Sequence, residues 1–128
     1  MYLEALASGE GVAVPLPLAR EDGIWRSDWA PLVRHLLMSP RPVPQRAMDV
    51  HASLAQALLD QVAAVAREHR FDAVGLSGGV FQNKRLCERV LSMLQAAGHT
   101  VHLPEAIPCN DAGLAFGQII HVGSQQDA

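Results

Sequence analysis

The sequence predicts an α/β fold in which a βαβ unit forms a parallel sheet packed by helices. A short, mostly apolar run at 72–76 has the length of a strand, and the turn Ser77-Gly78-Gly79 follows it. Apolar residues then recur at intervals of three and four until Gly98, which is a typical helix stop. Residues 100–103 predict a second strand, and two strands that flank one helix are normally parallel.

Before this unit, the chain is expected to form short elements separated by turns and prolines. Residues 2–7 are helix formers without an N-cap, a pattern typical of the last turns of a helix from a longer protein. Residues 12–18 alternate in character, but their prolines restrict them to an edge strand or an extended segment. A turn at 21–23 allows 24–26 to return as a short strand.

Two helices are expected between this hairpin and the βαβ unit. Ser27 or Asp28 can cap the first, which ends near Met38, and the proline-rich residues 39–44 then form a stiff, extended connection. Residues 46–69 predict the longest helix, whose alanine-rich apolar face suits close packing against a sheet.

After the second strand, residues 104–108 are expected to form a loop. Asn110 or Asp111 can cap a last helix that runs through Ile120. The polar residues 123–128 are expected to form a disordered tail. The 128 residues, 49% of them hydrophobic, therefore fit a single α/β domain fragment at 1–122.

Composition argues against several classes of function. The net charge of −3 and an aromatic content of 5% argue against a nucleic-acid partner. No apolar run approaches the roughly 18 residues that a membrane helix needs. Met1 is not followed by a signal peptide, so the cytoplasm is the expected compartment. Cys87 and Cys109 have no metal-type spacing.

The glycine turn after the first strand is the first candidate site. Without a Cβ, Gly78 and Gly79 would let a phosphate, ribose or base approach the main chain closely. The following helix start adds unpaired N–H donors, and the Asn83 amide could donate and accept nearby. The alternative is a plain strand-to-helix turn whose glycines serve geometry alone, because one Gly-Gly pair is a weak signal.

The segment 109–113 follows the second strand and is the second candidate site. It should lie on the same sheet edge as the glycine turn, so Asp111 could bind a metal or assist at a phosphate across a cleft. The alternative is that Asp111 is simply a helix cap. Of the six histidines, none forms an HxxxH pair, and His51 is the hardest to dismiss because it lies early in the longest helix.

Two motifs give the sequence a family resemblance. Residues 76–83 (LSGGVFQN) and 108–118 (PCNDAGLAFGQ) closely resemble the C-terminal end of the hydrogenase maturation carbamoyltransferases, the HypF family. The opening residues 3–7 and the Val50-His51 pair also look like that family's pattern. The resemblance covers about residues 3–118, and a weaker version of the motif pair occurs in the TsaD-type tRNA threonylcarbamoyladenosine synthases.

The resemblance implies the second half of an ASKHA fold, the fold of actin, Hsp70 and sugar kinases. It also implies an enzyme that converts carbamoyl phosphate and ATP to carbamoyl-adenylate. Such an enzyme passes the carbamoyl group to the C-terminal cysteine of a HypE-type acceptor in nickel–iron hydrogenase maturation. By resemblance, Gly78, Gly79 and Asn83 contact the nucleotide and Asp111 is one ligand of a divalent metal ion. No catalytic residue is identified.

Departures from the family pattern limit these expectations. The family usually has Phe where Val50 stands and Gly where Ala112 stands. Its paired metal-binding histidines lie upstream of the region that carries the resemblance, so the isolated chain is expected to be inactive. The surface on which the other half of the domain would dock is expected to be exposed, which would favour a homodimer. A TsaD-type protein and a non-catalytic ASKHA module that binds a nucleotide or partner are the alternatives, although Phe81-Gln82 and Gly117-Gln118 favour HypF.

Overall fold

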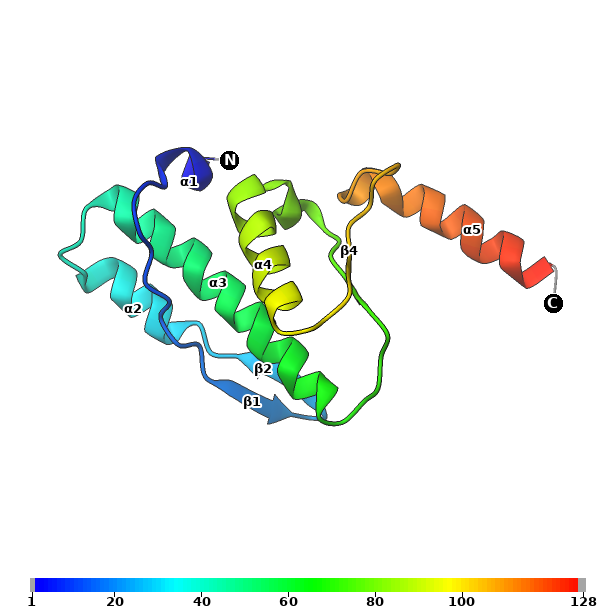
Figure 1. The fold of residues 1–128 in the computed structure, drawn as a ribbon, viewed down its shortest axis with the longest axis horizontal. Coiled ribbons are helices and arrows are strands. Elements are labelled where there is room, and N and C mark those ends of the chain that lie inside the picture. The colour runs from blue at the N-terminus through cyan, green and yellow to red at the C-terminus, as the bar shows by residue number, and fades with distance from the viewer. Residues whose placement is uncertain (1, 127–128) are drawn as a thin grey trace.

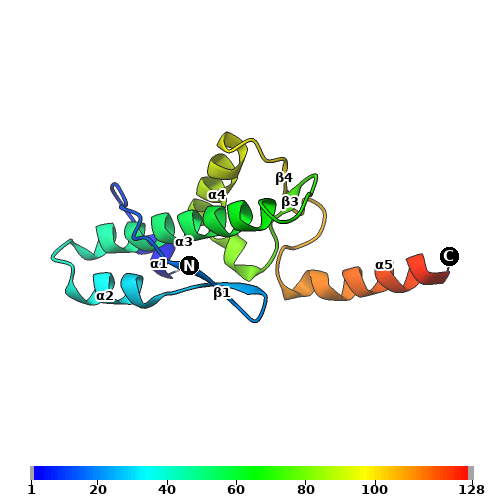
Figure 2. The same cartoon turned by 90° about the horizontal axis from the view of Figure 1, so that it is seen from below.

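The computed structural model describes residues 2–126 and arranges them around one long helix, α3 (Figure 1). In chain order the elements are α1 (Tyr2–Leu6), β1 (Leu18–Glu21), β2 (Ile24–Ser27), α2 (Ala30–Met38), α3 (Val43–Ala66), β3 (Val74–Gly75), the 3-10 helix η1 (Gly79–Gln82), α4 (Lys84–Ala96), β4 (Val101–His102), the 3-10 helix η2 (Asp111–Gly113) and α5 (Leu114–Gln126). Helix α4 packs on one side of α3, and α2 with the β1–β2 hairpin lies on the other (Figure 2).

The predicted hairpin is confirmed, with its first strand later than expected. Strands β1 and β2 pair antiparallel, and Asp22 and Gly23 both have positive φ, as a two-residue type I′ turn requires. Residues 11–17 are extended but unpaired, because Pro15 and Pro17 cannot donate to a ladder.

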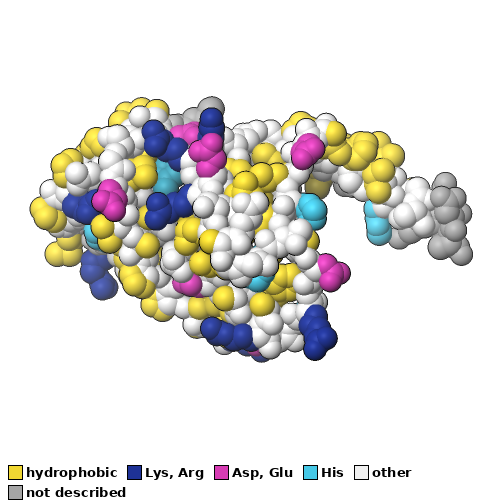
Figure 3. Space-filling model, viewed as in Figure 1, with side chains coloured by type: hydrophobic (Ala, Val, Ile, Leu, Met, Phe, Trp, Pro, Cys, Tyr) yellow, Lys and Arg dark blue, Asp and Glu magenta, His cyan; other side chains and the backbone are white. Residues whose placement is uncertain are grey.

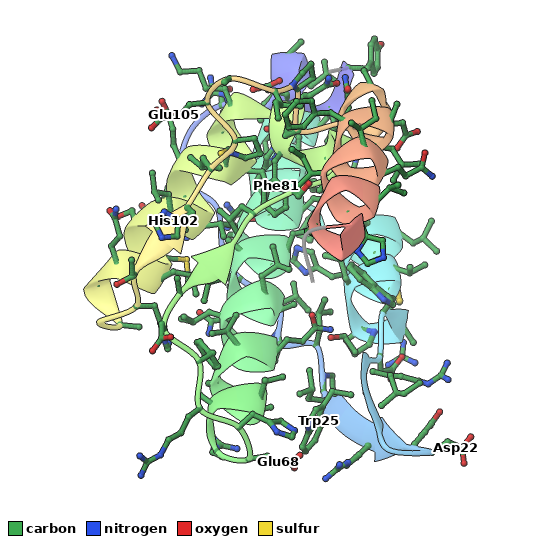
Figure 4. The ribbon with its side chains drawn as sticks, turned by 90° about the vertical axis from the view of Figure 1, so that its right-hand side faces the viewer. Asp22, Trp25, Glu68, Phe81, His102 and Glu105 are labelled. Carbon is green, nitrogen blue, oxygen red and sulfur yellow. The ribbon has the colours of Figure 1, made fainter. Side chains whose placement is uncertain are left out.

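Arg20 ties the hairpin to the end of α3. Its guanidinium lies 5.8 Å from the ring centre of Trp25, and its Nη1 is 2.8 Å from Glu68 Oε1. Trp25 and Glu68 lie at the same end of the molecule, while Asp22 marks the hairpin tip (Figure 4).

The βαβ unit is confirmed as parallel. Val74 pairs with Val101 and Gly75 with His102. Two backbone bonds frame the pair, from Val74 N to Thr100 O at 2.8 Å and from Leu76 N to His102 O at 2.9 Å. Gly98, with φ +87°, ends α4 as predicted.

The main core lies between α3, α4 and the small parallel sheet. Its buried members are Ala55, Leu76, Leu86, Val90 and Leu94, and Phe81 of η1 packs against them. Phe81 is half-buried against this core, whereas Glu105 lies at the periphery (Figure 4). The apolar face of α3 therefore packs against α4 and a very short sheet.

Two boundaries expected from the sequence are corrected. Helix α3 begins at Val43, inside the proline run expected to be extended, because Pro44 in a first turn needs no N–H partner. Helix α5 continues to Gln126, past the boundary expected at residue 122, because a single Gly123 costs a helix only about 1 kcal/mol. Residues 127 and 128 of the expected disordered tail lie outside the described residues.

Helix α5 projects away from the rest of the molecule (Figures 1 and 2). Its large apolar side chains are exposed: Leu114, Phe116, Ile119, Ile120 and Val122. Across the described part of the chain, no helix combines the length and apolar character needed to cross a membrane.

Helix α3 also buries three polar side chains, Asp49, His51 and Ser53. The Asp49 carboxylate accepts the Val12 N–H at 2.8 Å, contacts His35 Nε2 at 2.9 Å and forms an ion pair with Arg41 Nε at 3.1 Å. Ser53 Oγ accepts the Val14 N–H at 2.9 Å. These contacts hold the extended segment and α2 against α3.

Replacing Gly11 by alanine tests how closely the extended segment lies on α3. A Cβ at Gly11 would lie 2.5 Å from the Met48 carbonyl oxygen, which is backbone and cannot swing aside. We expect Gly11→Ala to lower the free energy of unfolding by roughly 1–3 kcal/mol, measured by urea denaturation. Gly75→Ala is the matched control, since a Cβ there meets nothing within 4 Å. Equal stability of the two variants would contradict the packing described.

Candidate functional site

The glycine turn after β3 is tied directly to the loop after β4. Gly78 has φ +108°, a conformation that residues with a Cβ rarely adopt. Its N–H donates to the carbonyl oxygen of Cys109 at 2.5 Å. The two loops predicted to share a sheet edge therefore touch each other.

Gly79, unlike Gly78, is not required to be glycine by its backbone conformation. No positive φ is required there, and its nearest neighbour for an added Cβ is the Asn110 Cβ at 4.0 Å. Neither backbone conformation nor packing within the described chain therefore demands glycine. Gly79 and Val80 begin η1, so their N–H groups have no acceptor inside that turn and can face a ligand.

The second loop leaves the Asp111 carboxylate available. Asn110, not Asp111, is the cap: Asn110 Oδ1 accepts the Ala112 N–H at 3.0 Å. Asp111 is exposed at the start of η2. A Cβ at Gly113 would lie 2.6 Å from the Pro108 carbonyl oxygen, so this glycine allows the loop to fold back tightly.

An open cleft of about 510 Å³ lies where the two loops meet the start of α5. Ser77 and Gly78 line it from the first loop, Cys109 and Asp111 from the second, and Gln118 and His121 from α5. Figure 3 shows the molecule hollowed between α5 and the body, with hydrophobic side chains along α5. Gly78 and Asp111, whose loops were predicted to share a sheet edge, thus line one cleft, whereas Gly79 is not among its lining residues.

Asn83 is half-buried and is not among the residues that line this cleft. It is the N-cap of α4, where its Oδ1 accepts the Leu86 N–H at 3.0 Å. Its Nδ2 lies 2.8 Å from His51 Nε2, and His51 Nδ1 lies 2.7 Å from the Ala47 carbonyl oxygen. The structure therefore gives Asn83 a capping role and a buried partner.

Of the two cysteines, Cys87 lies on α4 and Cys109 lines the cleft. Burial raises the pKa of the Cys87 thiol, and negative charge at Cys109 and Glu88 raises it further. A raised pKa lowers the thiolate fraction near neutral pH, so Cys87 is suited to packing and not to nucleophilic attack.

The described residues do not make a complete metal site. Within residues 2–126, no three His, Cys, Asp or Glu side chains lie close enough together to hold one ion. A catalytic metal normally takes about three protein ligands. Within the described residues, Asp111 is therefore not part of a three-ligand cluster.

Several residues around the site were not predicted from the sequence. Gln118 and His121 share a face of α5, as their i, i+3 spacing in the sequence would have indicated. Asp49 was missed as well, although it lies with Ser53 at an i, i+4 spacing inside an otherwise apolar helix. The contact between His51 and Asn83 spans 32 residues and leaves no local pattern.

Comparison with known proteins identifies the family to which this chain is similar. The family model for the second subdomain of the Kae1-like domain of carbamoyltransferases matches residues 1–118. Carbamoyltransferase HypF of Rhodobacter capsulatus is 37% identical over 120 residues, which cover 94% of this chain and 15% of that protein. HypF of Rhizobium leguminosarum bv. viciae is 36% identical over 92 residues, covering 71% of this chain and 12% of that protein.

Solved structures agree in fold. A crystal structure of full-length HypF in the phosphate- and nucleotide-bound form matches with a TM-score of 0.90 at 24% identity, over 98% of this chain and 17% of that chain. The chain thus spans between 12% and 17% of the length of these relatives.

The family model therefore identifies residues 1–118 as the second subdomain of a Kae1-like carbamoyltransferase domain, to which the parallel βαβ unit belongs. Among carbamoyltransferases, the 37% identity across nearly the whole chain points to the HypF proteins. The chain belongs to the HypF carbamoyltransferase family, and the TsaD-type alternative is set aside.

Proposed function

We propose that this chain provides one wall of the nucleotide cleft of a HypF-type carbamoyltransferase. The complete polypeptide would use carbamoyl phosphate and ATP to form carbamoyl-adenylate and transfer the carbamoyl group to the C-terminal cysteine of a HypE-type acceptor. The observation that carries the proposal is the hydrogen bond from Gly78 N to Cys109 O, which joins the glycine turn and the Asp111 loop in one cleft. A HypF of the same fold has been solved with phosphate and nucleotide bound.

The glycine turn is proposed to contact the nucleotide. The Gly78 N–H is used by Cys109, so Gly78 contributes the shape of the turn. The free N–H groups of Gly79 and Val80 are suited to a phosphate or ribose oxygen, because a helical first turn presents donors and a partial positive charge. Of the two Asn83 amide hydrogens, one faces His51 and the other remains for the nucleotide.

Asp111 is proposed as one ligand of a divalent metal ion. Its carboxylate is exposed, lines the cleft and is not used as a cap. Hard cations such as Mg²⁺ prefer carboxylate oxygens. The remaining ligands would come from upstream parts of the complete polypeptide.

The complete polypeptide is expected to transfer carbamoyl groups, and this chain alone is not. Isolated residues 1–128 lack the second wall of the cleft, so incubation with carbamoyl phosphate, ATP and HypE should leave HypE unmodified by mass spectrometry. The exposed apolar side chains of α5 should make the isolated chain self-associate, which light scattering measures. Transfer by the isolated chain, or ATP binding without transfer by the complete polypeptide, would contradict the proposal.

Gly79→Val in the complete polypeptide tests the glycine turn. An added Cβ would meet only the Asn110 Cβ within this chain, at 4.0 Å, so the fold should persist, but the valine side chain would occupy the position of a close ligand. We expect ATP affinity to fall at least about tenfold by calorimetry, the equivalent of about 1.4 kcal/mol. Gly75→Val, in the preceding strand, is the control and should bind normally. Unchanged affinity in Gly79→Val would remove the turn from the nucleotide site.

Asp111→Ala tests the metal ligand in the same polypeptide. Loss of one carboxylate should markedly lower the metal content retained after gel filtration, as elemental analysis would show. Glu105→Ala removes an exposed acid from the neighbouring loop without touching the cleft and serves as the control. Normal metal content in Asp111→Ala would reject the ligand role.

A further inference from the structure

His51 is a buried polar side chain for which the proposed reaction has no direct use. Only 1% of its surface is exposed, and it lies among the alanines of α3. It neither lines the cleft nor reaches the Asp111 loop. Its partners are Ala47 on its own helix and Asn83 at the start of α4.

The partners fix the hydrogen positions on the imidazole. The Ala47 carbonyl oxygen can only accept, so His51 Nδ1 carries the proton and donates to it at 2.7 Å. In the neutral ring, Nε2 is then an acceptor, and it lies 2.8 Å from Asn83 Nδ2. The ring therefore presents an acceptor to the Asn83 amide.

The hydrogen bond from Leu86 fixes the orientation of the Asn83 amide independently of His51. Its Oδ1 accepts the Leu86 N–H at 3.0 Å, so its Nδ2 must face His51. Flipping the amide would place an oxygen against the Nε2 acceptor and an NH₂ group against the Leu86 N–H. One chain of hydrogen bonds, from Leu86 to Ala47, thus holds the Asn83 side chain in a single orientation.

We propose that His51 is a positioning residue for nucleotide binding. It holds the Asn83 carboxamide so that the second amide hydrogen is ready for the nucleotide, a role that rests on the proposed contact between Asn83 and the nucleotide. The backbone N–H of Asn83 donates to the Val80 carbonyl oxygen at 3.1 Å. The contact between the Asn83 side chain and His51 therefore also connects the end of the glycine turn to α3. A side chain that is already ordered loses less conformational entropy when the ligand binds.

The experiment is a double-mutant cycle in the complete polypeptide, with ATP affinity measured by calorimetry. Asn83→Ser keeps a good N-cap but removes the amide, so it separates capping from ligand contact. His51→Leu removes the acceptor. We expect each variant to weaken ATP binding by roughly three- to tenfold, the usual range for one hydrogen bond. In the Asn83→Ser background, His51→Leu should weaken binding no further, because its effect passes through Asn83.

A matched control separates positioning from general loss of stability. Ser53 is buried on the same helix and bonds to Val14 and Asp49, away from Asn83. Ser53→Ala should lower the midpoint of thermal unfolding and leave ATP affinity unchanged. Equal weakening of ATP binding by Ser53→Ala and His51→Leu would overturn the positioning role.

The two levels of the proposal fail in different ways. Unchanged affinity in Asn83→Ser would reject Asn83 as a nucleotide contact and with it this part of the proposed function. If Asn83→Ser weakens binding but His51→Leu does not, or the two effects simply add, only the role of His51 is overturned. If His51→Leu does not fold, His51→Gln replaces it in the experiment, because the glutamine Oε1 can accept from Asn83 Nδ2. An ATP affinity within about twofold of the parent supports the positioning role. A loss of affinity as large as that of Asn83→Ser contradicts it.

Discussion

A polar side chain buried in an apolar helix must find hydrogen-bond partners, because leaving it unpaired costs about 1–3 kcal/mol. Helix α3 buries Asp49, His51 and Ser53, and each of them bonds to a segment outside this helix. Asp49 and Ser53 hold the extended N-terminal segment, and Asp49 also holds α2. His51 holds the start of α4, which follows the glycine turn. The apolar core supplies much of the driving force for folding, while these polar contacts specify where each segment lies.

The site depends on this arrangement because its own elements are very short. Strands β3 and β4 contribute two residues each, so the ladder alone is a weak support for two loops. The bond between Gly78 and Cys109 and the core around Leu76 and Leu86 complete that support. Gly78 is needed for the conformation of the turn, whereas a Cβ at Gly79 would meet only the Asn110 Cβ, at 4.0 Å, beside free N–H groups. The geometry of a plain strand-to-helix turn would explain Gly78 but not Gly79, and this difference supports the proposed ligand role of the turn.

Local sequence patterns predicted the elements whose causes are local. The positive-φ turn at Asp22-Gly23, the stop at Gly98 and the parallel βαβ unit all follow from residue type and spacing. Where α3 begins was missed, because a proline run is compatible with both an extended segment and a first helical turn. The capping choice between Asn110 and Asp111, and the pairing of Asn83 with His51, depend on tertiary contacts that no local pattern encodes. Of the candidate site, the sequence therefore predicted the shared edge of the two loops but not the orientation of Asn83.

The claim on which the account depends is that one nucleotide meets both the glycine turn and the Asp111 loop. A crystal structure of the complete polypeptide with ATP and Mg²⁺ tests it most directly. The account predicts nucleotide atoms within hydrogen-bond distance of the Gly79 or Val80 N–H, and the cation within coordination distance of the Asp111 carboxylate. A nucleotide bound elsewhere, with both loops free of ligand, would contradict it.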